Sequence, residues 1–149
     1  MSSTNQENSN LVSLPLIRAH LYISIVFIMV VVLAGLAYSL QFIDLFPFEG
    51  VEFLSPGRIR MVHTQAVAYA WTANIFFALI MYIVPKLTNK PILSEKFGWF
   101  IFYAYNFLIL ATVVLILAGY GQALEWGETP KILDPFLALV VVLFVLNIV

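Results

Sequence analysis

The chain has 149 residues, of which 62% are hydrophobic and only 10% are charged, with a formal net charge of −1. A soluble domain of this size needs many more surface charges, so the composition is that of a membrane protein. The near-zero net charge argues against nucleic acid as a partner. Because cysteine is absent, this chain carries no disulfide, thiolate metal site, cysteine nucleophile or covalent c-type haem.

The chain divides into a polar leader, residues 1–13, and a membrane domain, residues 14–149. A membrane-spanning helix requires about 20 apolar residues. We therefore expect three complete spans and the start of a fourth in an all-α, polytopic transmembrane helix bundle. The apolar stretches run from about Leu16 to Phe42, from about Arg60 to Val84 with a stop at Pro85, from about Phe97 to Tyr120, and from Ile132 onward.

The fourth stretch is still apolar at Val149, with no Gly or Asn cap, basic anchor or polar tail. We interpret it as an interrupted helix, which predicts that the chain is the amino-terminal part of a longer protein. Basic residues predict the orientation: Arg18, Lys86, Lys90 and Lys96 lie on the amino-terminal side, against Arg58, Arg60 and Lys131 opposite. The positive-inside rule then predicts a cytoplasmic amino terminus.

The segment Arg58-Ile59-Arg60-Met61-Val62-His63-Thr64 carries the main functional signal. Histidine is rare in membrane spans, and it usually serves a cofactor, an ion path or a proton relay there. Imidazole is also a standard axial ligand of haem iron, and arginine pairs well with acidic groups of a cofactor. The alternatives are a structural role for His63 and interfacial anchoring for Arg58.

The short loop between the second and third helices makes them antiparallel, so the start of one lies beside the end of the other. This predicts a cluster that combines His63 and the arginines with Glu125 and Glu128, unless these carboxylates only face solvent. After His63, Ala66, Ala70 and Ala73 follow at helical spacing and would allow close approach of a neighbour.

The other histidine, His20, lies near the opposite membrane face, about 30 Å from His63. We expect it to be a structural residue at the interface, beside Arg18. Asn74 and Asn106 are expected to bond between helices.

Two segments resemble the catalytic subunit I of haem–copper oxidases, above all the cbb-type (C-family) cytochrome c oxidases. Residues 57–85, with Arg-x-Arg-x-x-His-Thr-x-Ala-Val, resemble the second helix of that subunit, and residues 100–134 resemble the next helix and its outer loop. The sequence Glu125-Trp126-Gly127-Glu128 stands where the family has Glu-Tyr-Ala-Glu, so both carboxylates match and the middle residues do not. The resemblance implies a fragment of a bundle of about twelve helices.

The resemblance also implies roles for single residues. His63 is expected to ligate the iron of the low-spin haem b, Arg60 to pair with a haem propionate, and Arg58 to be a second cofactor-binding candidate. Glu125 is expected to bind calcium directly, with Glu128 in the same network, so Glu125→Gln should lower haem content and activity more than Glu128→Gln. No catalytic residue is expected within this fragment.

For the complete subunit, the resemblance implies a high-spin haem, copper and calcium, whose remaining ligands lie beyond Val149. It implies a respiratory oxidase in the bacterial inner membrane that reduces oxygen to water and transfers protons. Its partners would be c-type cytochrome subunits, cytochrome c as electron donor, and the lipid membrane. The alternatives are the large subunit of a nitric oxide reductase, which shares the Arg-x-x-His-Thr pattern, and a membrane transport or assembly module without haem.

Overall fold

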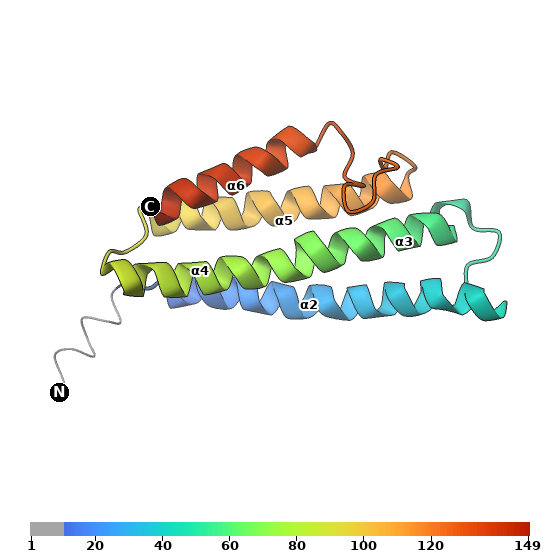
Figure 1. The fold of residues 1–149 in the computed structure, drawn as a ribbon, viewed down its shortest axis with the longest axis horizontal. Coiled ribbons are helices and arrows are strands. Elements are labelled where there is room, and N and C mark those ends of the chain that lie inside the picture. The colour runs from blue at the N-terminus through green and yellow to red at the C-terminus, as the bar shows by residue number, and fades with distance from the viewer. Residues whose placement is uncertain (1–10) are drawn as a thin grey trace.

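A computed structural model describes residues 11–149 as a bundle of helices (Figure 1). Within these residues, three helical segments are long and apolar enough to cross a membrane, and a shorter apolar helix follows them. The predicted all-α, polytopic bundle is therefore confirmed. The helices are α2 (Leu14–Ser39), α3 (Pro56–Gln65), α4 (Ala73–Thr88), α5 (Glu95–Leu117) and α6 (Asp134–Ile148), with short 3₁₀ turns η1 (Leu40–Ile43) and η2 (Glu52–Leu54) and a π-helical segment η3 (Ala66–Thr72).

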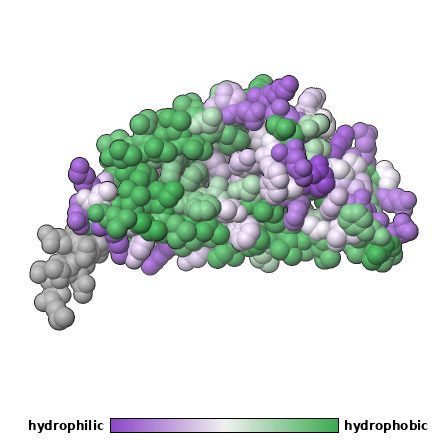
Figure 2. Space-filling model, viewed as in Figure 1, coloured by the Kyte–Doolittle hydropathy of each residue, from purple (hydrophilic) through white to green (hydrophobic). Residues whose placement is uncertain are grey.

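The second span is one continuous rod made of α3, η3 and α4, residues 56–88. It packs along α2 on one side and against α5 on the other, and α6 packs along α5 (Figure 1). The α2–α3 and α5–α6 connections lie at the same end of the bundle, as the antiparallel arrangement predicts. In Figure 2 the visible helix surfaces are mostly hydrophobic, and hydrophilic residues gather at that end and along the α5–α6 connection.

The predicted stop of the second span at Pro85 is wrong, because α4 continues through it to Thr88. Proline removes one backbone donor, which is tolerable so close to the end of a helix. The Thr88 hydroxyl donates to the Val84 carbonyl over 2.9 Å, which adds a side-chain hydrogen bond in this last turn. The helix ends at Asn89, which adopts a left-handed conformation with φ 53°.

The third span ends at Leu117, earlier than the expected Tyr120. Gly119, just beyond it, has φ +95°, a left-handed conformation that glycine adopts at little cost and that turns the chain out of the helix. The α5–α6 connection therefore begins three residues earlier in the sequence than the hydropathy pattern suggests.

The π-helical segment η3 is pinned by two hydroxyl groups. The Thr72 hydroxyl donates to the Val67 carbonyl, five residues earlier, over 2.7 Å. The Tyr105 hydroxyl, from α5, donates to the Tyr69 carbonyl over 2.7 Å. Side chains thus occupy carbonyl groups that the wider turn leaves accessible. Such segments inside α-helices occur frequently at functional sites.

The π segment also corrects the expected stripe of small residues. Ala66 and Ala70 are buried and form part of the core, as a close approach between helices requires. They lie within η3, however, so the α-helical spacing assumed for Ala66, Ala70 and Ala73 does not apply. The sequence shows no proline or glycine in this segment that would have indicated the irregular turn.

Candidate functional site

His63 lies in the last turns of α3, half-buried against α2. Its Nδ1 is 2.9 Å from the backbone carbonyl oxygen of Val31. A carbonyl only accepts hydrogen bonds, so Nδ1 carries the proton and donates, and the lone pair remains on Nε2. Metal-binding histidines are usually held in this way, with one ring nitrogen on a carbonyl group and the other on the metal. The ring is therefore arranged to present Nε2 to a ligand.

Arg60 lies one turn before His63 and is half-buried. Across residues 11–149 its guanidinium has neither an ion pair nor a side-chain hydrogen bond. A guanidinium at the edge of a membrane bundle is expensive without an anion, and carboxylates and phosphates are the anions that it binds best. The position next to His63 therefore suits an acidic group of a bound cofactor.

Arg58 is engaged differently. Its Nη2 forms an ion pair with Glu52 over 3.0 Å, and its Nη1 donates to the Leu117 carbonyl at the end of α5 over 3.0 Å. The Arg58 side chain is 21% exposed and that of Glu52 is 89% exposed. Arg58 therefore ties the start of α3 to the end of α5. This contact is compatible with the predicted anchoring role and leaves its cofactor role as a prediction.

Glu128 is brought onto α3, beside the residues that follow His63. It is 1% exposed, and its carboxylate accepts hydrogen bonds from the Thr64 hydroxyl over 3.1 Å and from Gln65 Nε2 over 2.8 Å. Gln65 Oε1 in turn accepts from the Thr129 hydroxyl over 3.0 Å. These hydrogen bonds hold the α5–α6 connection against α3, the helix that carries His63. The predicted proximity of this connection to the start of the second span is therefore confirmed.

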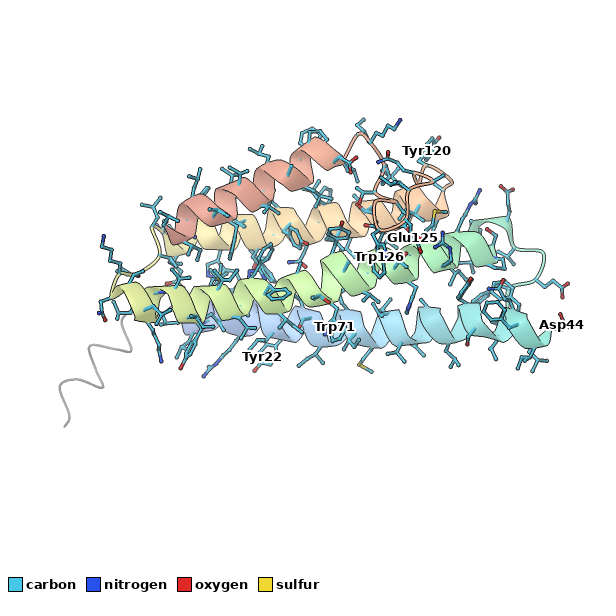
Figure 3. The ribbon with its side chains drawn as sticks, viewed as in Figure 1. Tyr22, Asp44, Trp71, Tyr120, Glu125 and Trp126 are labelled. Carbon is cyan, nitrogen blue, oxygen red and sulfur yellow. The ribbon has the colours of Figure 1, made fainter. Side chains whose placement is uncertain are left out.

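Glu125 lies in the same connection but is exposed. Figure 3 shows Glu125 and Trp126 next to one another on this connection, over the second span. Trp126 adopts a left-handed conformation with φ 64°, and its carbonyl accepts a hydrogen bond from the Tyr69 hydroxyl over 2.9 Å. The part of the chain that the structure describes has no group of three or more His, Cys, Asp or Glu side chains arranged for a metal ion. The calcium role of Glu125 and Glu128 therefore stays a prediction.

His20 corrects the expectation of an interface residue, because it is fully buried between helices. Its Nδ1 is 2.7 Å from Asn74 Oδ1, and the Asn74 amide group donates to Asn106 Oδ1 over 3.1 Å. The predicted interhelical bonding of Asn74 and Asn106 is thus confirmed. Asn74 lies on the facing helix and supplies a polar partner for the buried Nδ1 of His20. Its structural role agrees with the expectation.

Three residues of the site escaped sequence reasoning: Val31, Gly35 and Gln65. Val31 acts through its carbonyl group, which every residue has, so its type gives no signal. Gly35 contacts the His63 ring, and an isolated glycine in a long apolar helix is a signal of close approach. Gln65 follows His63 and Thr64 directly, and its polarity within a membrane span could have indicated a bonded partner.

The comparisons with known proteins agree on one family. The family described as cytochrome c and quinol oxidase polypeptide I matches residues 16–149. A cytochrome c oxidase subunit 1 homolog of Agrobacterium tumefaciens is 30% identical over 72% of this chain and 20% of its own length. A bacteroid cytochrome c oxidase subunit 1 homolog of Bradyrhizobium diazoefficiens is 33% identical over 64% of this chain and 18% of its own length. A cbb3-type cytochrome c oxidase subunit of Stutzerimonas stutzeri is 26% identical over 60% of this chain and 19% of its own length.

The chain therefore spans about a fifth of the length of the curated relatives it matches.

Proposed function

The chain belongs to the cytochrome c and quinol oxidase polypeptide I family, the haem–copper oxidase subunit I family, and we propose that it supplies one axial ligand of the low-spin haem b. His63 is the ligand, and Nε2 is the ligating atom. The observation that carries this proposal is the hydrogen bond between Nδ1 and the Val31 carbonyl, 2.9 Å long. It fixes the tautomer that leaves the Nε2 lone pair available to iron.

The charges around His63 support the same proposal. Arg60 has no anionic partner within residues 11–149 and would pair with a haem propionate. Glu128 is buried with hydrogen bonds from neutral groups and no cation within ion-pair distance among the described residues. A calcium ion bound by Glu125 and Glu128 would compensate that charge and those of the propionates. When bound, the haem supplies one-electron transfer.

For the whole subunit we propose the activity of a terminal oxidase of the cbb type, with oxygen reduced to water at a high-spin haem and copper. Cytochrome c and c-type cytochrome subunits would supply the electrons, and the complex would lie in a bacterial inner membrane with a cytoplasmic amino terminus. Because the chain covers about a fifth of its relatives, these properties belong to the complete subunit. The His63 end of the bundle then lies toward the outer membrane face.

The test replaces each histidine in the complete subunit within its assembled complex. His63→Ala removes the axial ligand, so we expect loss of the low-spin haem bands in reduced-minus-oxidised spectra and loss of turnover. His20→Ala is the matched control: it also removes a membrane-embedded imidazole, but one that is closed to ligands, and should keep the bands. A His63→Ala enzyme that retains a complete bis-histidine haem spectrum would disprove the proposed role.

A further inference from the structure

α2 carries a glycine at the point where it meets the His63 ring. A Cβ atom placed on Gly35 would lie 2.6 Å from Cε1 of His63, 2.9 Å from Nδ1 and 3.4 Å from Nε2. Carbon atoms in proteins do not approach within 3 Å, so the ring occupies the volume that any side chain at this position would need. The edge of the imidazole thus lies directly on the backbone of α2.

The backbone of Gly35 does not itself require glycine. It lies inside α2, and its φ is not among the positive values found at Gly50 and Gly119. Glycine inside a helix is less favourable than alanine, because it loses more conformational freedom on folding. The reason for glycine here is therefore the space that it leaves for His63.

The space that Gly35 leaves on α2 for the His63 ring is called the slot. The Val31 carbonyl, which accepts the Nδ1 hydrogen bond, also borders it. Val31 and Gly35 are four residues apart, so they lie on the same face of α2, one turn above the other. The missing side chain sets how close the ring comes to α2, and the carbonyl sets its rotation. The missing side chain alone does not set the rotation of the ring, and the carbonyl alone does not set its distance from α2.

We propose that Gly35 is a positioning residue for the His63 ligand, holding the imidazole close enough to α2 for Nδ1 to keep its bond to the Val31 carbonyl. This inference rests on the proposed function of His63. A hydrogen bond at Nδ1 makes the imidazole a stronger electron donor, which favours the oxidised iron. Gly35 therefore contributes to a low midpoint potential of the haem as well as to its place.

The experiment uses Gly35→Ala in the complete subunit within its complex. The added methyl group pushes the ring away from α2 and weakens the Nδ1 bond, so potentiometric titration should give a higher midpoint potential for the low-spin haem, with haem content retained. Electron paramagnetic resonance should show a changed low-spin signal, because the ring orientation changes. An unchanged potential and an unchanged signal would overturn the proposal.

Two glycines provide matched controls. At Gly98 in α5, a Cβ would come within 2.5 Å of the Leu16 side chain, so Gly98→Ala tests crowding against α2 at the other end of the bundle. At Gly57 no atom lies within 4 Å of the added Cβ, so Gly57→Ala tests the substitution without crowding. Both variants should leave the potential unchanged. A shift with Gly98→Ala equal to that with Gly35→Ala would assign the effect to general packing and overturn the proposal.

A double-mutant cycle covers the case in which Gly35→Ala prevents assembly. If the methyl group clashes with the ring, the loss of membrane-assembled subunit caused by Gly35→Ala should disappear in the His63→Ala background. Equal losses in both backgrounds would overturn the proposal. The result of this cycle is independent of the proposed function. A His63→Ala enzyme that keeps its haem spectrum would reject haem ligation. The cycle would still show whether Gly35 and the His63 ring are coupled.

Discussion

The two histidines of the chain lie in the same apolar bundle, and each directs Nδ1 at an oxygen atom of a facing helix. His63 donates to a backbone carbonyl over 2.9 Å and is half-buried. His20 bonds to the Asn74 side chain over 2.7 Å and is fully buried. Its ring lies perpendicular to that of Phe102, with the two ring centroids 4.8 Å apart. The difference between them lies at the second nitrogen, Nε2.

The hydrogen-bond network of His20, Asn74 and Asn106 is buried and closed to external ligands. Asn74 Nδ2 donates to the Ala70 carbonyl over 2.7 Å, which turns Oδ1 toward His20 and places the histidine proton on Nδ1. His20 Nε2 is buried without a hydrogen-bond partner among residues 11–149. No external ligand reaches this atom, because the aromatic rings of Phe77 and Phe102 lie edge-on around the imidazole. The comparison teaches that access to Nε2, rather than the presence of a histidine, would distinguish the proposed ligand His63 from His20 in this bundle.

The largest effect that sharpens this comparison is expected from Asn74→Leu. The change removes the acceptor of His20 Nδ1 and the donor to Asn106, leaving buried polar groups without partners. We expect a loss of about 2 kcal/mol in stability, since each stranded group costs about 1 kcal/mol. Thermal denaturation of the detergent-solubilised complex measures this loss. The low-spin haem spectrum should stay intact at low temperature, because the closed network does not hold the haem.

The control for Asn74→Leu replaces the whole network. The triple variant His20→Phe, Asn74→Leu and Asn106→Leu leaves no polar side chain of the network behind, so it should recover much of the lost stability. Loss of the haem spectrum in Asn74→Leu at normal thermal stability would contradict the distinction between the two histidines.

The next effect concerns the two glutamates beside the His63 end. Glu128 accepts from Thr64 and from Gln65, and Glu128→Gln keeps only one acceptor oxygen. The loss of one charge-assisted hydrogen bond should lower stability by about 1.5 kcal/mol. Glu125 is exposed, so Glu125→Gln should change thermal stability only through the calcium and haem that it loses. The same denaturation measurement compares both variants.

Calcium content separates the two glutamates in the opposite order. If Glu125 is the direct ligand, Glu125→Gln lowers calcium and haem content more than Glu128→Gln does. Elemental analysis of the purified complex measures the calcium. Unchanged calcium content and full activity in Glu125→Gln would leave Glu125 as a residue of a solvated loop.

The smallest effect is expected at the π segment between the two histidines. Tyr105→Phe removes the hydroxyl that donates to the Tyr69 carbonyl in η3, at a cost of about 0.6 kcal/mol, the average for hydrogen bonds between membrane helices. Tyr103→Phe, two residues earlier on an exposed face of α5, should cost nothing. Comparison of the two melting temperatures in the complex gives the difference. Equal melting temperatures would show that the hydroxyl of Tyr105 does not stabilise η3.

The spans and the placing of Glu128 beside the second helix were predictable, because hydropathy and short connections determine them. The continuation of α4 past Pro85 was not, because a proline can either end a helix or stand within its last turn. The burial of His20 was also missed, since it depends on which residues of a distant helix face it. At the site, sequence indicated His63, Arg60 and the glutamates, but the Val31 carbonyl gives no residue-specific signal.

The π segment has a consequence for the relation between the two ends of the second span. One residue of an α-helix corresponds to a rotation of about 100° around the axis. The π segment takes up one more residue per turn than an α-helix does, so the same seven residues wound as α-helix would turn the end with His63 relative to the end with Asn74 by roughly that angle. With Asn74 held by His20 on α2, the imidazole of His63 would leave its slot on the same helix. The wide turn thus sets the rotation between the two ends of the second span, so that both His63 and Asn74 face α2.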